Sequence, residues 1–257
     1  MPRANRYQVA DTIYHLTHRC HDRQFLLRFA KDRNVYRDWM REGLRRYPVS
    51  LLAYCITSNH VHLVLHAEKI ESVSRFMQLV EGSTAQQYNL RKKRSGGFWS
   101  ERYHCTMVDS GSYLCRCLQY VDLNMVRAGV VKHPRDWEWG SYRELMGERR
   151  RYRLLNVRKL LDRLGYETMN ELRSSYSEEI SRALTAGISR DATWTENLAV
   201  GSKTFVDRMS QRWPHRRALE VEERGGTWMV REAGSAYDSF LGIESRSKAT
   251  GKALNRG

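Results

Sequence analysis

Short apolar runs alternate with helical patterns along the N-terminal part of the chain. The runs at 12–19, TIYHLTHR, and 48–57, PVSLLAYCIT, have the apolar and β-branched character of strands. Residues 29–46 repeat apolar side chains at helical spacing, and so do residues 72–93, which begin at Ser72, a residue type that often starts helices. This part of the chain therefore predicts strands and helices in turn.

The same alternation continues through the next segments. The run SNHVHLVLH at 58–66 follows the preceding strand through a tight connection, which predicts a hairpin. Residues 98–108, FWSERYHCTMV, predict another strand, and residues 109–131 predict a helix. The resulting order is strand, helix, strand, strand, helix, strand, helix. It predicts an α+β fold with a ferredoxin-like or RRM-like antiparallel sheet covered by helices.

The pattern changes near residue 140, where it becomes helical and highly charged. On composition we divide the chain into a domain at 1–140 and a basic, mainly helical region at 141–257. The polar end of that region, SRSKATGKALNRG, predicts a flexible tail.

The composition favours a well-packed protein with a polyanionic partner. Hydrophobic residues make up 41% of the 257 residues, which allows a substantial core. Lys and Arg number 44 against 29 Asp and Glu, and the resulting net charge of +15 favours nucleic acid over a membrane surface. A basic but otherwise ordinary protein surface is the plain alternative.

The N-terminus and the cysteines favour a cytoplasmic, nucleoid-associated protein. The N-terminal stretch MPRANRYQVADTIYHL is polar and basic and lacks the apolar segment of a signal peptide. The five cysteines include no C-x-x-C pair, so the pattern indicates neither a disulfide framework nor a zinc knuckle.

Three basic stretches are candidates for phosphate contacts along a DNA strand. They lie at the N-terminus, in the loop RKKRSGG and in the run ERRRYR. The candidate DNA-binding residues are Arg3, Arg6, Arg91, Lys92, Lys93, Arg94, Arg149, Arg150 and Arg151.

Two histidines share one face of the strand at 58–66. Side chains two positions apart point to the same face, so His60 and His62 lie opposite the core-facing Val61 and Leu63. Neutral imidazole is a common metal ligand. A His-x-His pair is also common on half-exposed strands, and a usable metal site needs at least one more ligand.

Tyr120 and Asn124 are four residues apart in YLCRCLQYVDLNMV, which places them on one face of a helix. If this helix covers the histidine face, the amide oxygen of Asn124 completes three ligands for a divalent Mg²⁺ or Mn²⁺ ion. A phenol beside such a cation can attack a phosphodiester and form a covalent phosphotyrosine. Taken singly, Tyr120 could equally be an ordinary helix tyrosine and Asn124 a helix cap.

Two other classes of function remain open at this point. The first is a nucleic-acid-binding module on an RRM-like sheet, although the strand HVHLVLH carries histidines where such modules carry aromatic residues. The second is a metal-dependent nuclease that activates water and forms no covalent intermediate. A covalent protein–DNA adduct separates the three, because only the tyrosine enzyme forms one.

The chain resembles the HUH endonuclease superfamily, and within it the single-tyrosine transposases of the REP-associated group. YHLTHRCHDRQF resembles the first strand and turn of that group, SNHVHLVL its histidine strand, and FWSERYHCTMV a later strand. YLCRCLQYVDLNMVRAGVV resembles its tyrosine helix, and WEWGSYREL and VGSKTFVDRM resemble C-terminal segments. The likeness extends from residue 7 to about residue 213.

The resemblance implies a metal-dependent single-stranded DNA endonuclease and strand transferase that acts on palindromic repeat hairpins. His60, His62 and Asn124 would bind the metal, and Tyr120 would form a 5′-phosphotyrosine, leaving a free 3′-OH. The resemblance also favours a monomer over a homodimer. Met125 stands where the group usually has proline after the asparagine, which predicts a helix that continues a little further.

Overall fold

The computed structural model of the protein describes residues 8–189, 191–212 and 219–232. The sequence-predicted order of the first elements is confirmed, and a short 3₁₀ helix, η1, follows β1. These elements are β1 (Thr12–Arg19), η1 (His21–Arg23), α1 (Ala30–Arg46), β2 (Val49–Ile56), β3 (His60–Ala67), α2 (Ser72–Lys92) and β4 (His104–Val108).

The first four strands pair in the order β4-β1-β3-β2, and every pair is antiparallel. This is the predicted ferredoxin-like arrangement, in which two strand–helix–strand units interleave. The register of β1 and β3 sets Thr17 opposite His62 and Arg19 opposite His60. The two histidines therefore share their sheet face with side chains of β1.

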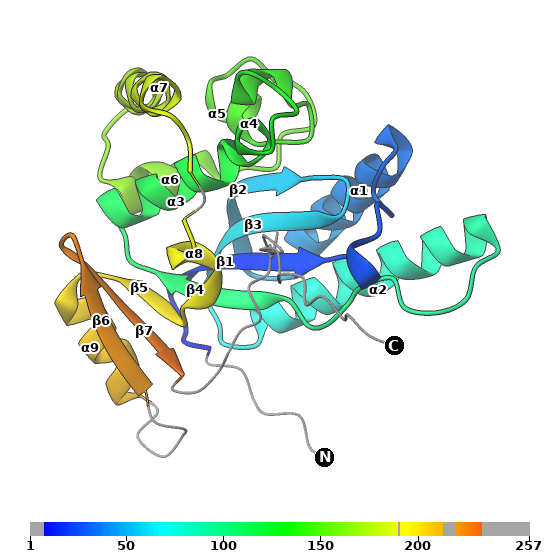
Figure 1. The fold of residues 1–257 in the computed structure, drawn as a ribbon, viewed down its shortest axis with the longest axis horizontal. Helices are drawn as coiled ribbons and strands as arrows, with labels where there is room; N and C mark the ends of the chain where they lie inside the picture. The colour runs from blue at the N-terminus through cyan, green and yellow to red at the C-terminus, as the bar shows by residue number, and fades with distance from the viewer. Residues whose placement is uncertain (1–7, 190, 213–218, 233–257) are drawn as a thin grey trace, which may run out of the picture.

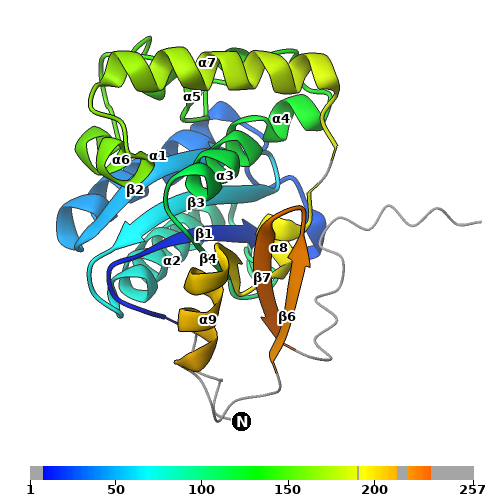
Figure 2. The same cartoon turned by 90° about the vertical axis from the view of Figure 1, so that its left-hand side faces the viewer.

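The helices α1 and α2 pack together on one side of this sheet (Figures 1 and 2). Gly43 of α1 brings the two helices close, because a Cβ at this position would lie 2.7 Å from the ring of Phe76 in α2. Tyr36, Met40 and Val80 are fully buried between the helices and the sheet. This apolar layer holds β3 so that its histidines face the opposite side.

The helix α3 (Ser112–Asp122) packs on that opposite side, against β2, β3 and β4. The sequence predicts one helix over 109–131, whereas the chain leaves helical geometry at Leu123 and forms a separate short helix, α4 (Asn124–Arg127). The deviation is small, because the Leu123 amide still donates to the Gln119 carbonyl at 2.9 Å. Asn124 consequently stays near the end of α3.

The predicted strand at 98–108 begins only at His104. Its first residues leave the alternating pattern because their large side chains enter the core. The Trp99 ring stacks on His18 at 4.1 Å between centroids, and its indole N–H donates to the Glu81 carbonyl at 3.1 Å. Large apolar side chains that enter the core from an irregular segment give the same sequence pattern as a strand.

The C-terminal region contributes strands as well as the expected helices. Its strand β5 pairs in parallel with β4, and β7 and β6 continue from β5, which gives a seven-stranded sheet in the described part of the chain. Figure 1 shows this extension at one edge of the sheet. The remaining elements are η2 (Pro134–Asp136), α5 (Tyr142–Leu145), α6 (Val157–Leu164), α7 (Met169–Ala186), α8 (Thr193–Glu196), β5 (Ala199–Gly201), α9 (Lys203–Gln211), β6 (Leu219–Arg224) and β7 (Thr227–Glu232).

The three added strands escape sequence analysis because they are short or charged. The strand β5 is only three residues long, and β6 reads LEVEER. The division near residue 140 stays a prediction, and the predicted flexible tail lies outside the described residues. Across the residues that the structure describes, helices long and apolar enough to cross a membrane are absent.

The junction between β4 and β5 yields a prediction about stability. A Cβ at Gly201 would overlap the Cβ of Asp109 and lie 2.7 Å from the Phe205 ring. We expect Gly201→Ala to lower the free energy of unfolding by about 1–3 kcal/mol, the usual cost of overpacking. Urea denaturation followed by circular dichroism measures this change.

Gly82 provides the matched control, because it lies within α2 and a Cβ there would meet nothing within 4 Å. Gly82→Ala should raise the free energy of unfolding by about 0.5–1 kcal/mol through the better helix propensity of alanine. Equal effects of the two substitutions would contradict the close packing of β5 on β4.

Candidate functional site

The predicted metal ligands meet between β3 and the start of α4. The Asn124 side-chain Nδ2 lies 3.0 Å from His62 Nε2, and the amide also hydrogen-bonds the His60 imidazole. His62 is buried and His60 keeps part of its surface accessible. The structure therefore brings together the three side chains that the sequence singled out.

Tyr120 lies beside this group, on the last turns of α3. Its ring meets the His62 ring edge to face, at 5.7 Å between centroids and an interplanar angle of 87°. The guanidinium of Arg127 lies over the tyrosine ring at 4.3 Å and also donates to the Tyr120 carbonyl. The candidate nucleophile is thus fixed between an imidazole and a cation.

Two residues of β1 complete the surroundings of His62, and sequence analysis missed both. His15 Nε2 lies 3.0 Å from His62 Nδ1, and the Thr17 hydroxyl lies 3.2 Å from the same nitrogen. On its other side, His15 Nδ1 donates to the Trp194 carbonyl at 2.7 Å. The alternation in TIYHLTHR puts His15 and Thr17 on one strand face, which was the available signal.

The turn before β3 holds the second histidine. His60 Nδ1 lies 2.8 Å from the Asn59 side-chain oxygen and 3.0 Å from the Thr57 hydroxyl. Thr57 also donates to the His60 carbonyl at 2.8 Å. The short connection SN therefore orients the imidazole as well as closing the hairpin.

Burial keeps these imidazoles neutral. Burial, with Arg19 and Arg127 nearby, lowers the pKa of His60 to about 3, and burial lowers the pKa of His15 to about 4. The pKa of His62 falls well below its usual value, first because the ring is buried and then because of the charged forms of His60 and His15. A neutral imidazole offers one nitrogen lone pair to a ligand.

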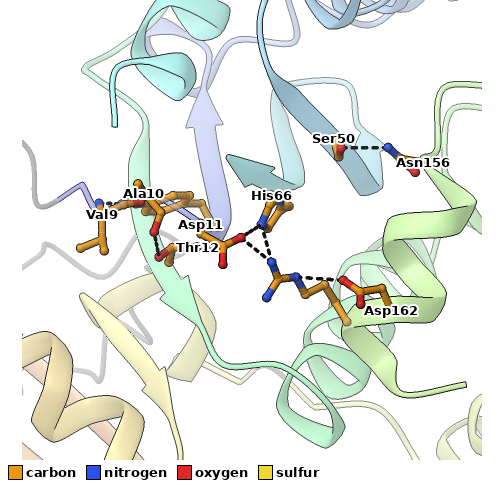
Figure 3. Close-up of polar contacts among 10 residues, drawn as sticks. Val9, Ala10, Asp11, Thr12, Ser50, His66, Asn156 and Asp162 are labelled. Carbon is orange, nitrogen blue, oxygen red and sulfur yellow. Dashed lines mark hydrogen bonds and ion pairs between the residues drawn. The ribbon is translucent and has the colours of Figure 1, made fainter. Parts of the chain in front are cut away.

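His66, the third histidine of the strand, belongs to a different cluster (Figure 3). Its Nε2 lies 2.8 Å from the carboxylate of Asp11, and Arg163 of α6 reaches both residues. The cluster ties α6 to the beginning of β1 and the end of β3. His66 therefore lies outside the group of side chains around His62.

Much of the predicted DNA-binding set is engaged within the protein. Arg91 pairs with the buried carboxylate of Asp32, and Arg94 donates to the Asn89 side chain and the Gly97 carbonyl. Arg149 donates to the Tyr54 hydroxyl at 2.5 Å and to the Glu138 carbonyl. Lys92, Lys93, Arg150 and Arg151 are exposed, and Arg3 and Arg6 lie outside the described residues.

The donor set defines what this site can bind. Within the described ranges, no group of three or more His, Cys, Asp and Glu side chains could hold a metal ion. A metal here would rest on two imidazoles and one amide, which leaves coordination positions for water or phosphate oxygens. A tyrosine next to such a set has the composition of a phosphoryl-transfer site.

The chain is similar to proteins described as transposases. Residues 8–124 match the family model described as "Transposase IS200 like". A protein of Haemophilus influenzae named as a REP-associated tyrosine transposase is 25% identical over 119 residues, which cover 42% of this chain and 68% of that protein.

The chain also aligns in part with two solved structures. A REP-associated tyrosine transposase bound to a REP hairpin aligns with a TM-score of 0.46 at 17% identity, covering 57% of this chain and 86% of that one. A Deinococcus radiodurans protein described as a transposase aligns with a TM-score of 0.34 at 19% identity, covering 47% and 95% of the two chains.

The family match spans the histidine strand and ends at Asn124, the last of the three candidate metal ligands along the chain. Residues 8–124, a little under half of the chain, are therefore similar to the IS200-like transposases, and the similarity to a REP-associated tyrosine transposase supports an enzyme.

Proposed function

We propose that this transposase is a metal-dependent single-stranded DNA endonuclease and strand transferase. It acts as a monomer on palindromic repeat hairpins, close to the chromosome in the cytoplasm, through a 5′-phosphotyrosine on Tyr120. The observation that carries the proposal is the convergence of Asn124 on both strand histidines, with the Tyr120 ring against His62. The hairpin substrate is inferred from the REP-associated group, to which the chain is similar.

Hydrogen bonding fixes which nitrogen of His62 is available. The Trp194 carbonyl can only accept, so His15 Nδ1 carries the proton and His15 Nε2 is an acceptor. His62 Nδ1 then donates to His15, and His62 Nε2 keeps its lone pair. That lone pair points at Asn124.

The proton of His60 is assigned in the same way. The Asn59 side-chain oxygen accepts from Nδ1, so the lone pair of His60 lies on Nε2. Turning the Asn124 amide about its last side-chain bond exchanges its nitrogen and oxygen, so that the oxygen faces the His62 lone pair. The residues present therefore fit a divalent ion such as Mg²⁺ or Mn²⁺, held by His60, His62 and Asn124.

When bound, such an ion would supply charge neutralisation at the scissile phosphate. The protein's own groups perform the remaining tasks. Tyr120 Oη gives up its proton to solvent and attacks phosphorus, the new O–P bond forms, and the bond from phosphorus to the 3′ oxygen breaks. The 3′ oxygen leaves with the electron pair and takes up a proton to become a 3′-OH. Arg127, over the tyrosine ring, stabilises negative charge that develops on the phenol oxygen.

Replacing Tyr120 tests the nucleophile. Tyr120→Phe keeps the ring that packs on His62 and removes only the hydroxyl, so folding and hairpin affinity should persist. Cleavage and the covalent adduct should vanish together, a loss of at least about 10³-fold in rate. Denaturing gels with labelled single-stranded repeat hairpins measure both products.

Tyr113 serves as the matched control, because it lies on the same helix but donates to the Gly226 carbonyl instead. Tyr113→Phe should cleave at the wild-type rate. A Tyr120→Phe protein that still cut without an adduct would instead identify a nuclease that activates water.

Removing the histidines tests the metal. His60→Ala and His62→Ala should each abolish cleavage, because each loses one imidazole ligand, while phosphate contacts from Lys and Arg maintain hairpin binding. The Mn²⁺ affinity, measured by isothermal titration calorimetry, should fall in parallel. Cleavage by either variant at the wild-type rate would rule out the metal site, and His66→Ala is the control on the same strand.

His15 offers a finer test, because within the site it hydrogen-bonds His62 and otherwise only packs edge to face on the Tyr120 ring, at 5.8 Å between centroids. His15→Leu removes the acceptor for His62 Nδ1 and should weaken Mn²⁺ binding by about 10–100-fold. His15→Gln keeps an acceptor and should restore most of that affinity. Two-dimensional ¹⁵N NMR of the imidazoles should show the Nδ1–H tautomer of His62 in the wild type. Equal Mn²⁺ affinities of the two variants would contradict this role of His15.

A further inference from the structure

A cavity of about 370 Å³ opens next to Tyr120, on the side of its ring away from the metal-binding group, and is also lined by Arg127 and Trp194. Its walls come from α3, from the segment between α7 and α8, and from the β6–β7 hairpin. Figure 2 shows these elements converging beside α8. Tyr120 separates the two sites, because its ring contacts His62 and also lines the cavity.

The charge of the cavity favours an anion. Arg116, Arg127 and Arg224 line it together with one carboxylate, that of Asp191, and Arg224 also pairs with Glu222 at 2.6 Å. Arg116 is held toward the cavity by its bond to the Thr227 hydroxyl at 3.0 Å, and Arg127 lies over the Tyr120 ring. Guanidinium groups arranged in this way suit phosphate oxygens.

The rest of the wall is suited to a flat, partly polar group. Leu123, Ile188 and Met229 supply apolar surface, and Gln119 and Thr193 supply hydrogen-bonding groups. The volume is of the order expected for a small ligand site and leaves room for one base with its sugar and phosphate. A base placed there would lie next to the tyrosine that attacks the strand.

We infer that this cavity binds one deoxynucleotide of the single strand, adjacent to the phosphate that Tyr120 attacks. The inference rests on the proposed function, because it takes Tyr120 as the nucleophile. It gives the C-terminal region a direct part in seating the substrate: Ile188, Asp191, Arg224 and Met229 all belong to that region. The nucleotide is seated by guanidinium contacts to its phosphate and by apolar contacts to its base.

The same segment also touches the metal-binding side. Trp194 lines the cavity, and its carbonyl accepts from His15, which in turn fixes His62. A nucleotide that contacts Thr193 and Trp194 would therefore steady the imidazole as well. Trp194 would therefore both contact the DNA strand and orient His62 through His15.

Filling the cavity tests the inference. Ile188→Trp places a large ring in the cavity, and Val221→Trp places the same ring on the exposed face of β6, outside the cavity. The probe is fluorescein-labelled single-stranded dT₁₂, measured by fluorescence anisotropy on the full-length protein at fixed salt. Ile188→Trp should weaken binding by about tenfold or more, the loss expected when a base loses its seat, and Val221→Trp should bind as the wild type does.

Crosslinking locates the strand directly. A dT₁₂ probe substituted with 5-iododeoxyuridine, irradiated on the wild type and analysed by peptide mass spectrometry, should attach near Tyr120, at Ile188–Trp194 or at Met229. Wild-type affinity of Ile188→Trp, or crosslinks confined to other surfaces, would overturn the inference. If the wild type cleaves hairpins and forms an adduct while either of these results occurs, the cavity proposal fails and the proposed function stands. Crosslinks in the cavity without any adduct would support nucleotide binding there and rule out Tyr120 as the nucleophile.

A charge variant covers the case in which Ile188→Trp lowers the melting temperature. Arg224→Gln should reduce the salt dependence of dT₁₂ binding by about one phosphate contact. Arg182→Gln, on the exposed surface of α7 and outside the cavity, should leave it unchanged. An unchanged salt dependence for Arg224→Gln would also overturn the inference.

Discussion

The proposed site depends on one line of hydrogen bonds that runs from the Trp194 carbonyl through His15 to His62. Each member is buried, so each polar atom on the line needs its partner. A carbonyl at one end leaves a single arrangement of protons along the line, and that arrangement leaves a lone pair on His62 Nε2. The chemistry of the site thus depends on a main-chain atom in α8, far from the histidine in sequence.

Because the Trp194 carbonyl belongs to the C-terminal region, that region must be fixed against the sheet for His15 to keep its partner. Thr106 of β4 donates to the Asn197 carbonyl at 2.6 Å, and β5 follows directly as the next strand of the sheet. The segment from Thr193 to Asn197 is thereby fixed on the same face as His15. In this arrangement the extension supports the proposed metal ligands, and the proposed nucleotide cavity places it on the substrate side too.

Sequence patterns could predict the parts of the site that follow a local period. The two-residue period of a strand identified His60 and His62, and the four-residue spacing on a helix identified Tyr120 and Asn124. His15 obeys the same strand period, but nothing local indicates that it meets His62. The Trp194 contribution is a carbonyl and has no sequence signature. Net charge predicts an anionic partner, but it does not predict which arginines are free to contact that partner. Arg91 and Arg149 are candidates from the sequence and are paired within the protein.

The most direct test of the central claim is to map the covalent adduct at residue level. After incubation with single-stranded repeat hairpins and divalent metal, the protein is digested with nuclease and protease and analysed by tandem mass spectrometry. The account predicts a 5′-phosphate-linked nucleotide on Tyr120 and on no other residue. An adduct on Tyr113 or another side chain, or cleaved DNA with unmodified Tyr120 throughout, would contradict it.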